Sequence, residues 1–169
     1  MDVVRHWYLV HTKPQKERVA KENLERQGYP FYLPLARQTR RRKGRWLDVI
    51  EPLFPRYLFV RLGAGHDSFR SVRYTTGVQN LVCFSEKPAV VPDSVVDSLM
   101  RAADPDTGLH DLNAPVFEPG KAVVIDSGPL AGVQGILLAK TGEDRVIVLL
   151  NMLGKENRVA IEHDLVRLV

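Results

Sequence analysis

The residue types that perform nucleophilic or metal chemistry are sparse in this sequence and poorly spaced for it. The single cysteine, Cys83, stands between Val82 and Phe84 in a strand-like run, where a thiol is usually an inert core group. The five histidines show neither an HExxH pattern nor ligand-pair spacing, and no phosphate-binding loop with a GK[ST] ending is present. We therefore expect a protein that is not an enzyme and that has no catalytic residue, no metal and no cofactor.

An acidic stretch beginning near residue 104 marks a change in composition. Asp104, Asp106, His110 and Asp111 are of types that bind metals, but the proline and glycine between them favour an acidic linker. The predicted organisation is a front domain at 1–103, a linker at 104–117 and a back domain at 118–169.

Basic residues are concentrated in the front domain. Residues 1–100 contain 17 Lys and Arg against 10 Asp and Glu, a net charge of +7 within a chain total of +4. The densest run joins two predicted strands and comprises Arg37, Arg40, Arg41, Arg42, Lys43 and Arg45. One interpretation is a solvated, flexible tip; the other is contact with the phosphates of DNA or nascent RNA. Trp46 borders the run and is expected to anchor the hairpin rather than stack on a base.

Strands and helices alternate in the front domain. The β-branched and aromatic runs predict strands, and the i, i+4 apolar spacing predicts helices. The expected strands are His6–Thr12, Phe31–Arg37, Trp46–Ile50, Arg56–Leu62 and Val78–Phe84, and the expected helices are Pro14–Gln27, Asp67–Arg73 and Pro92–Ala103. This order indicates an α+β fold, with helices packed on an antiparallel sheet.

The back domain has a different pattern. Five short β-branched runs, with Gly, Pro and Ser turns between them, are the expected strands of this domain: 121–126, 133–139, 145–150, 157–161 and 165–169. Short strands at this spacing predict a small five-stranded barrel. No apolar run is long enough to span a membrane, the start of the chain does not look like a signal peptide, and one cysteine fits a reducing compartment, so we expect a cytoplasmic protein.

Several short motifs carry a family resemblance along nearly the whole chain. The front domain contains WYLV at 7–10, EPLFPRYLFV at 51–60 and TGV at 76–78, and the back domain contains PGK at 119–121 and GVQG at 132–135, in the manner of a KOW motif. This sequence resembles the NusG family of transcription elongation factors. EPLFPRYLFV and LLNMLGKE at 149–156 look most like its specialised RfaH branch.

The resemblance implies a mechanism without covalent chemistry. Members dock on the clamp helices of the RNA polymerase β′ subunit, reach toward the β subunit and reduce pausing and termination. RfaH-type members also contact the non-template DNA strand, and their back domain binds the small ribosomal subunit. A monomer is expected, with a termination factor as another possible partner of the back domain. The alternatives are a general NusG-like factor without DNA recruitment and a ribosome-associated KOW protein that binds RNA.

The resemblance also assigns residues. The polymerase-docking positions are Leu9, Tyr57, Phe59, Phe84, Val96 and Leu99, which are otherwise ordinary core residues. The DNA-contacting positions are Lys13, Lys16, Asn23, Arg26, Gln27, Thr75 and Thr76, which are otherwise a solvated helix face and a turn. Asn23 replaces a histidine and Thr76 replaces an arginine of the RfaH branch, so we expect an altered or weaker sequence preference.

The back domain has a second possible fold in the RfaH branch, a helical hairpin that masks the front domain. Glu51 and Arg145 match the two sides of its interdomain salt bridge. The first helix would include Gly128, Gly132 and Gly135, at about 1 kcal/mol each, and Pro129, at about 3 kcal/mol more. The sequence therefore favours the barrel, with the helical hairpin as the alternative.

Overall fold

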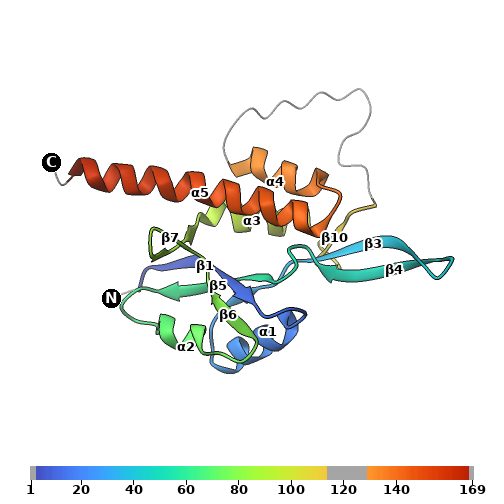
Figure 1. The fold of residues 1–169 in the computed structure, drawn as a ribbon, viewed down its shortest axis with the longest axis horizontal. Helices are drawn as coiled ribbons and strands as arrows, with labels where there is room; N and C mark the ends of the chain where they lie inside the picture. The colour runs from blue at the N-terminus through green and yellow to red at the C-terminus, as the bar shows by residue number, and fades with distance from the viewer. Residues whose placement is uncertain (1–2, 114–128, 168–169) are drawn as a thin grey trace.

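A computed structural model describes residues 3–113 and 129–167, with side chains in the second stretch described at 133–155 and 157. Figure 1 shows the arrangement of its elements. In chain order these are β1 (Arg5–Thr12), α1 (Glu17–Arg26), β2 (Phe31–Tyr32), β3 (Leu35–Arg42), β4 (Arg45–Pro52), β5 (Tyr57–Gly63), α2 (Phe69–Arg73), β6 (Val78–Leu81), β7 (Cys83–Phe84), β8 (Lys87–Pro88), β9 (Val90–Val91), α3 (Asp93–Ala102), β10 (Leu109–Asp111), α4 (Pro129–Leu138) and α5 (Gly142–Arg167).

An antiparallel sheet organises the front of the chain, as the sequence predicts. Its strands lie in the order β2-β5-β1-β6, and β9 also pairs with β1. All the predicted helices of this region are present with shorter bounds. The first begins at Glu17 rather than at Pro14, because Gln15 has a φ of 59° and cannot belong to a right-handed helix.

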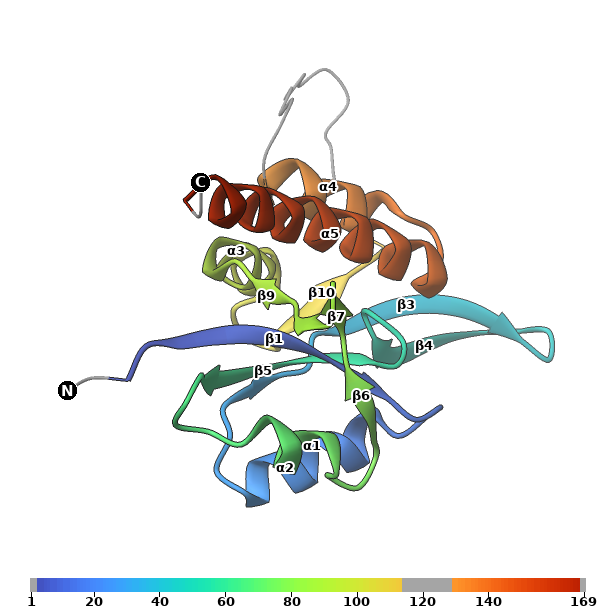
Figure 2. The ribbon, with the colours of Figure 1, turned by 60° about the vertical axis from the view of Figure 1, so that its left-hand side comes forward.

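The sheet has a separate apolar core on each face because side chains alternate along its strands. Leu9 and Phe59 point to the face covered by α3, α4 and α5, whereas Val10 and Leu58 point to the face covered by α1 and α2. Figure 2 shows the sheet between these two helical layers. Any surface on α1 therefore lies across the sheet from any surface under α5.

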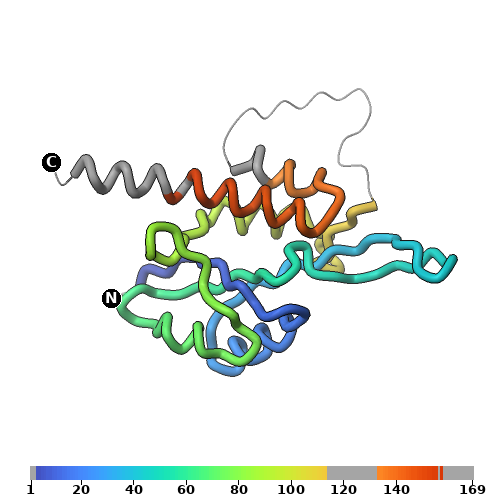
Figure 3. The backbone as a smooth tube through the Cα atoms, in the orientation of Figure 1, coloured from blue at the N-terminus to red at the C-terminus, as the bar shows by residue number. Residues whose placement is uncertain are grey.

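β3 and β4 form a long antiparallel ribbon that extends away from the rest of the molecule, as the tube in Figure 3 shows clearly. Its base is joined by β10, which runs parallel to the first residues of β3. β10 falls inside the stretch predicted as a linker. His110 of this strand is 1% exposed, with Nε2 2.8 Å from the Leu99 carbonyl oxygen, so its ring faces the backbone of α3 rather than a metal site.

The described part of the back half forms two helices instead of the predicted barrel. The expected strands at 133–139, 145–150 and 157–161 are replaced by helices α4 and α5, which is the helical-hairpin alternative. The expected strand at 121–126 lies outside the described residues. Within residues 3–113 and 129–167, no helix combines the length and apolar character that crossing a membrane requires.

Two physical reasons account for this difference. Pro129 is the first residue of α4, where its missing N–H costs little, so the expected interior-proline penalty does not apply. The helix retains Gly132 and Gly135, which cost about 2 kcal/mol together. Against this, Ile136 and Leu149 are fully buried on the front half, and each such side chain contributes roughly 1.5–3 kcal/mol. Tertiary burial therefore outweighs the local preference for strands.

Candidate functional site

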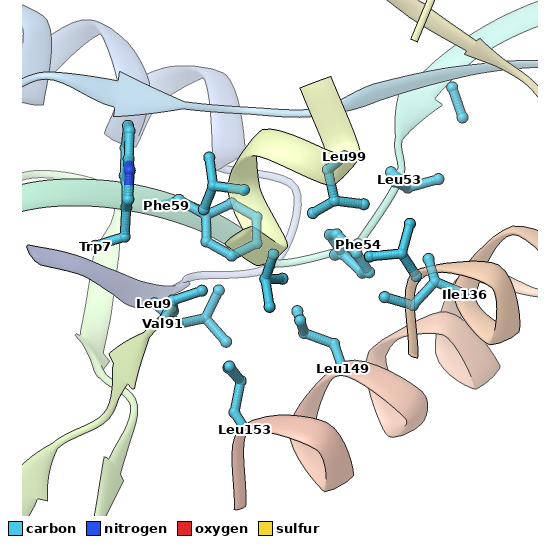
Figure 4. Close-up of a cluster of buried hydrophobic side chains, with 14 residues drawn as sticks. Trp7, Leu9, Leu53, Phe54, Phe59, Val91, Leu99, Ile136, Leu149 and Leu153 are labelled. Carbon is cyan, nitrogen blue, oxygen red and sulfur yellow. The ribbon is translucent and has the colours of Figure 1, made fainter. Parts of the chain in front are cut away.

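The residues expected to dock on a polymerase all belong to one apolar cluster. They come from β1, β5, β7 and α3, which the fold brings to one face of the sheet. The buried members are Leu9, Phe59, Val96 and Leu99, and the half-buried members packed against them are Tyr57 and Phe84. We call these six residues the apolar face; Figure 4 shows the buried cluster to which they belong.

Helices α4 and α5 cover the apolar face. Ile136, Leu149 and Leu153 are fully buried in the same cluster, and the Leu149 and Leu153 side chains project from α5 toward the strands in Figure 4. Gly154 lies against the Phe84 ring, where an added Cβ would be 3.6 Å from Cε1. In this structure the apolar face is therefore covered by the back half of the chain and is not a free surface.

Arg145 of α5 joins the two halves, although not through the expected salt bridge. The residue is 1% exposed. Its Nε donates to the Leu53 carbonyl oxygen at 2.8 Å, and its Nη1 donates to that of Ala139 at 3.3 Å. The Glu51 carboxylate instead pairs with Arg40, at 2.5 Å from Nη2. Burial lowers the pKa of Arg145, while the nearby Glu51 charge opposes this shift. The partner of Arg145 in the front half is therefore the Leu53 backbone carbonyl, and the Glu51 carboxylate pairs with Arg40 instead.

Two further contacts of α5 were not predicted from the sequence. The Asn157 side chain forms both hydrogen bonds that a neighbouring strand would make with Val90: its Oδ1 accepts from the Val90 amide at 3.1 Å, and its Nδ2 donates to the Val90 carbonyl at 3.1 Å. Gly142, the first residue of α5, approaches Pro55 so closely that an added Cβ would lie 2.5 Å from the ring. An isolated asparagine or glycine in a sequence gives no signal for such contacts.

The expected DNA-contacting residues lie on α1, on the short segments at its two ends and on the turn after α2, on the other side of the sheet. Gln27 Nε2 donates to Thr75 Oγ1 at 2.8 Å, and the Lys13 amide donates to the Gly77 carbonyl oxygen at 2.9 Å. Gly77 has a φ of +93° and lies against Ala20 of α1, where a Cβ would be 2.7 Å from the backbone nitrogen. The turn and the helix therefore form one surface, which we call the α1 face.

The members of the α1 face differ in what they offer to a ligand. The exposed members are Lys13, Lys16, Arg26, Gln27 and Thr76. Thr75 is only 6% exposed, and its hydroxyl donates to the Ser71 carbonyl oxygen at 2.8 Å while accepting from Gln27. Asn23 Nδ2 is also occupied, by the Val19 carbonyl oxygen at 2.8 Å. Thr75, Asn23 and Gln27 therefore hold the surface in place, and the exposed lysines and Arg26 carry its positive charges.

The structure adds an aromatic residue to the α1 face. Tyr74 immediately precedes Thr75 and is 78% exposed, with the Arg70 guanidinium carbon 5.5 Å from its ring centroid. An exposed ring beside cations is suited to stacking on an unpaired base. The one signal available in the sequence is a tyrosine between Arg73 and Thr75, but hydrophobic periodicity does not distinguish such a ring from a core residue.

The predicted basic loop is mostly strand. β3 continues to Arg42 and β4 starts at Arg45, so the loop itself is only Lys43 and Gly44. Trp46 does not anchor the hairpin in a core, because 69% of it is exposed. The long ladder between the strands, and not an indole anchor, holds this ribbon together.

The sequence of this chain is similar to those of known proteins. Proteins named transcription termination/antitermination protein NusG from Staphylococcus aureus strains Mu50 and N315 are each 29% identical over 171 residues, covering 95% of this chain and 93% of their own length. A solved structure described as "Domain interaction in Thermotoga maritima NusG" has 25% identity and a TM-score of 0.44, over 58% of this chain and 56% of its own. A family model described as transcription termination factor nusG matches residues 5–100, more than half of the 169 residues, and the chain therefore belongs to the NusG family.

Proposed function

We propose that this protein is a non-enzymatic transcription factor that binds RNA polymerase and promotes elongation through pauses and terminators. One observation carries the proposal: six residues expected at a polymerase interface form a single apolar face, and within the described part of the chain α4 and α5 cover it. The names of the Staphylococcus aureus relatives, transcription termination/antitermination protein, support the same process. The partner that we infer for the apolar face is the pair of clamp helices of the β′ subunit, with contact toward the β subunit.

In the proposed cycle, the described structure is the masked state. A polymerase helix and α5 would need the same side chains, because Leu149 and Leu153 already occupy the cluster that contains Leu9 and Phe59. The two partners therefore compete, and the apparent affinity for polymerase falls by the fraction of molecules that are closed. This is the behaviour expected of the RfaH-like branch rather than of a general factor.

The α1 face supports recruitment by DNA before unmasking. It lies across the sheet from α4 and α5, so closure leaves it open. Its free lysine and arginine charges suit the phosphates of an exposed non-template strand, and Tyr74 suits an unpaired base. The hydrogen bond between Gln27 and Thr75 holds this surface in shape, so the Thr75 hydroxyl does not itself contact a base.

We also propose that the released back half takes the barrel form suggested by its KOW-like motif. Its helical state depends on burial against the front half, whereas its β-branched runs and glycines favour strands when that burial is lost. In that form it would offer a surface to the small ribosomal subunit or to a termination factor, after polymerase has taken the apolar face.

Two matched substitutions on α5 test the masked state. Leu149 is fully buried against the front half, and Ile147, two residues away, is 56% exposed. Leu149→Glu places a carboxylate in the interface and should open the hairpin, whereas Ile147→Glu changes the same helix on its free side. Binding of each full-length variant to a reconstituted elongation complex is then measured against the wild type.

We expect Leu149→Glu to bind at least tenfold more tightly than the wild type, and Ile147→Glu to bind as the wild type does. Equal binding by all three proteins would mean that closure does not control docking. Failure of all three to bind, with and without a hairpin-forming non-template element, would contradict the polymerase proposal and favour a ribosome-associated protein.

A further inference from the structure

The tip of the β3–β4 ribbon has a defined geometry. Lys43 and Gly44 have φ values of 51° and 76°, the paired left-handed conformations of a two-residue hairpin turn. The ladder on either side places Arg42 opposite Arg45 and Arg41 opposite Trp46. The tip is thus a structured end of a ribbon, and its side chains have fixed neighbours.

The positive charges of the ribbon fall into two groups. Arg37 pairs with Asp111 at 2.8 Å and Arg40 pairs with Glu51, and both pairs lie toward the body. The remaining acid of the ribbon, Asp48, accepts a hydrogen bond from Thr39 at 2.8 Å. Among the described residues, the four cations at the tip have no carboxylate within ion-pair distance: Arg41, Arg42, Lys43 and Arg45.

Two of these cations face each other directly. Arg42 and Arg45 are cross-strand partners at the last rung of the ladder, and like charges in that position destabilise a ribbon. A bound phosphate would remove this repulsion. Solubility alone would be served as well by charges of mixed sign, so the arrangement favours a polyanionic ligand.

Trp46 distinguishes between kinds of polyanion. Its indole is 69% exposed, and the Arg41 guanidinium carbon is 6.0 Å from the ring centroid. A carboxylate-rich protein or a base-paired duplex would engage the cations without using the indole. An unpaired base can stack on it while the flanking phosphates meet the arginines.

We propose that the ribbon tip is a binding site for single-stranded nucleic acid, in which Trp46 stacks on an unpaired base and the four tip cations contact the adjacent phosphates. The ribbon extends to one side of the molecule, away from α1 (Figures 1 and 2), so this is a second site beside the α1 face. It does not depend on the proposed polymerase binding. The shared chemistry of an unpaired base and phosphates admits either DNA or RNA as its source.

The two tryptophans of the chain make the site directly measurable. Trp7 is 7% exposed, whereas Trp46 is largely exposed, so quenching by a stacked base should come from Trp46. The full-length protein is titrated with an oligodeoxythymidylate, and fluorescence and affinity are recorded together. We expect quenching in the wild type and none in Trp46→Phe, in which Trp7 is the only tryptophan.

Affinity and its salt dependence separate the contribution of base stacking from that of the phosphate contacts. Trp46→Ala should weaken binding by roughly 5- to 150-fold without changing the slope of log K against log salt, and Trp46→Phe should retain most of the affinity. Arg42→Gln should instead make the slope less steep by about 0.7, the contribution of one phosphate contact on a single strand. An oligonucleotide with abasic sites has no base to stack on Trp46, so it should bind the wild type and Trp46→Ala with equal affinity.

Two further measurements identify the kind of strand that binds and exclude the α1 face as the source of the signal. Lys13→Ala with Lys16→Ala should leave the Trp46 quenching intact, because those lysines lie on the other surface. Preference for the matched RNA oligonucleotide would assign the site to a transcript, and preference for DNA would assign it to a displaced strand; either supports the site. Absence of quenching, an unchanged affinity in Trp46→Ala, or stronger binding of an acidic peptide would overturn the proposal.

Discussion

At the residue scale, Arg145 joins the two halves of the molecule mainly through a carbonyl group. Its guanidinium is buried and donates to Leu53 across the interface, whereas Glu51 lies in a partly exposed pair with Arg40. A buried donor to a carbonyl is costly to remove, because the carbonyl is left without a partner. A partly exposed ion pair contributes little and is screened by salt.

We therefore expect unequal effects from the two members of the expected salt bridge. Arg145→Ala should raise the open fraction, because losing the bond to Leu53 costs about 1–3 kcal/mol. Glu51→Gln should change closure much less. Polymerase binding by the two variants, measured at low and high salt, tests this ordering. Equal, salt-sensitive effects would show that the Glu51–Arg145 charge interaction dominates.

Tyr74 is the residue on the α1 face whose role is easiest to isolate. Tyr74→Ala should weaken binding to the exposed non-template strand by about 1–3 kcal/mol, the range for loss of one stacking ring, while Tyr74→Phe should bind nearly as well as the wild type. Binding is measured on two elongation complexes. In one the exposed non-template strand has its bases, and in the other it has abasic sites at the same positions. If Tyr74→Phe fails as Tyr74→Ala does, the hydroxyl and not the ring makes the contact.

At the element scale, two glycines of α5 have opposite surroundings. Gly142 is the first residue of the helix and has no room for a Cβ beside the Pro55 ring, whereas a Cβ at Gly154 would make an ordinary contact with Phe84. Alanine also favours a helix interior over glycine by about 1 kcal/mol. The same substitution should therefore act in opposite directions at the two positions.

Gly142→Ala should open the hairpin, because the rigid Pro55 ring cannot move aside cheaply, and Gly154→Ala should stabilise the closed state by up to about 1 kcal/mol. Polymerase affinity should rise in the first variant and fall up to about fivefold in the second. Each glycine variant is the control for the other. A change in the same direction in both would mean that helix propensity, and not the fit at Pro55, governs closure.

The sequence predicts most elements of the front half because the hydrophobic period of each segment matches the faces that are buried in the fold. Leu9 and Val10, for example, alternate between two covered faces of the sheet, as a buried strand requires. The back half could not be predicted in the same way. The stretch containing Ile136 and Leu149 has strand-forming neighbours, and its helical state depends on a surface made by distant residues. Contacts such as Asn157 with Val90 exist only after that docking.

At the scale of the whole molecule, the sheet separates a covered surface from an open one. The apolar face is closed by α4 and α5, while the α1 face and the ribbon tip stay accessible. In the cycle that we propose, a nucleic acid binds the closed protein, whereas polymerase competes with α5 for the same side chains. On this proposal, the stability of the helical hairpin sets the activity.

Release of the hairpin should change the secondary structure of the back half, because its helices depend on the front half for burial. Circular dichroism of Leu149→Glu should show less helix and more strand than the wild type, and Ile147→Glu should match the wild type. The second core, with Val10, Leu24 and Leu58, contains none of the α5 side chains that the structure describes, so the front half should still unfold cooperatively. Full retention of helix by an open, polymerase-binding Leu149→Glu would instead mean that the hairpin moves as a rigid unit. In that case the barrel would have no part in unmasking.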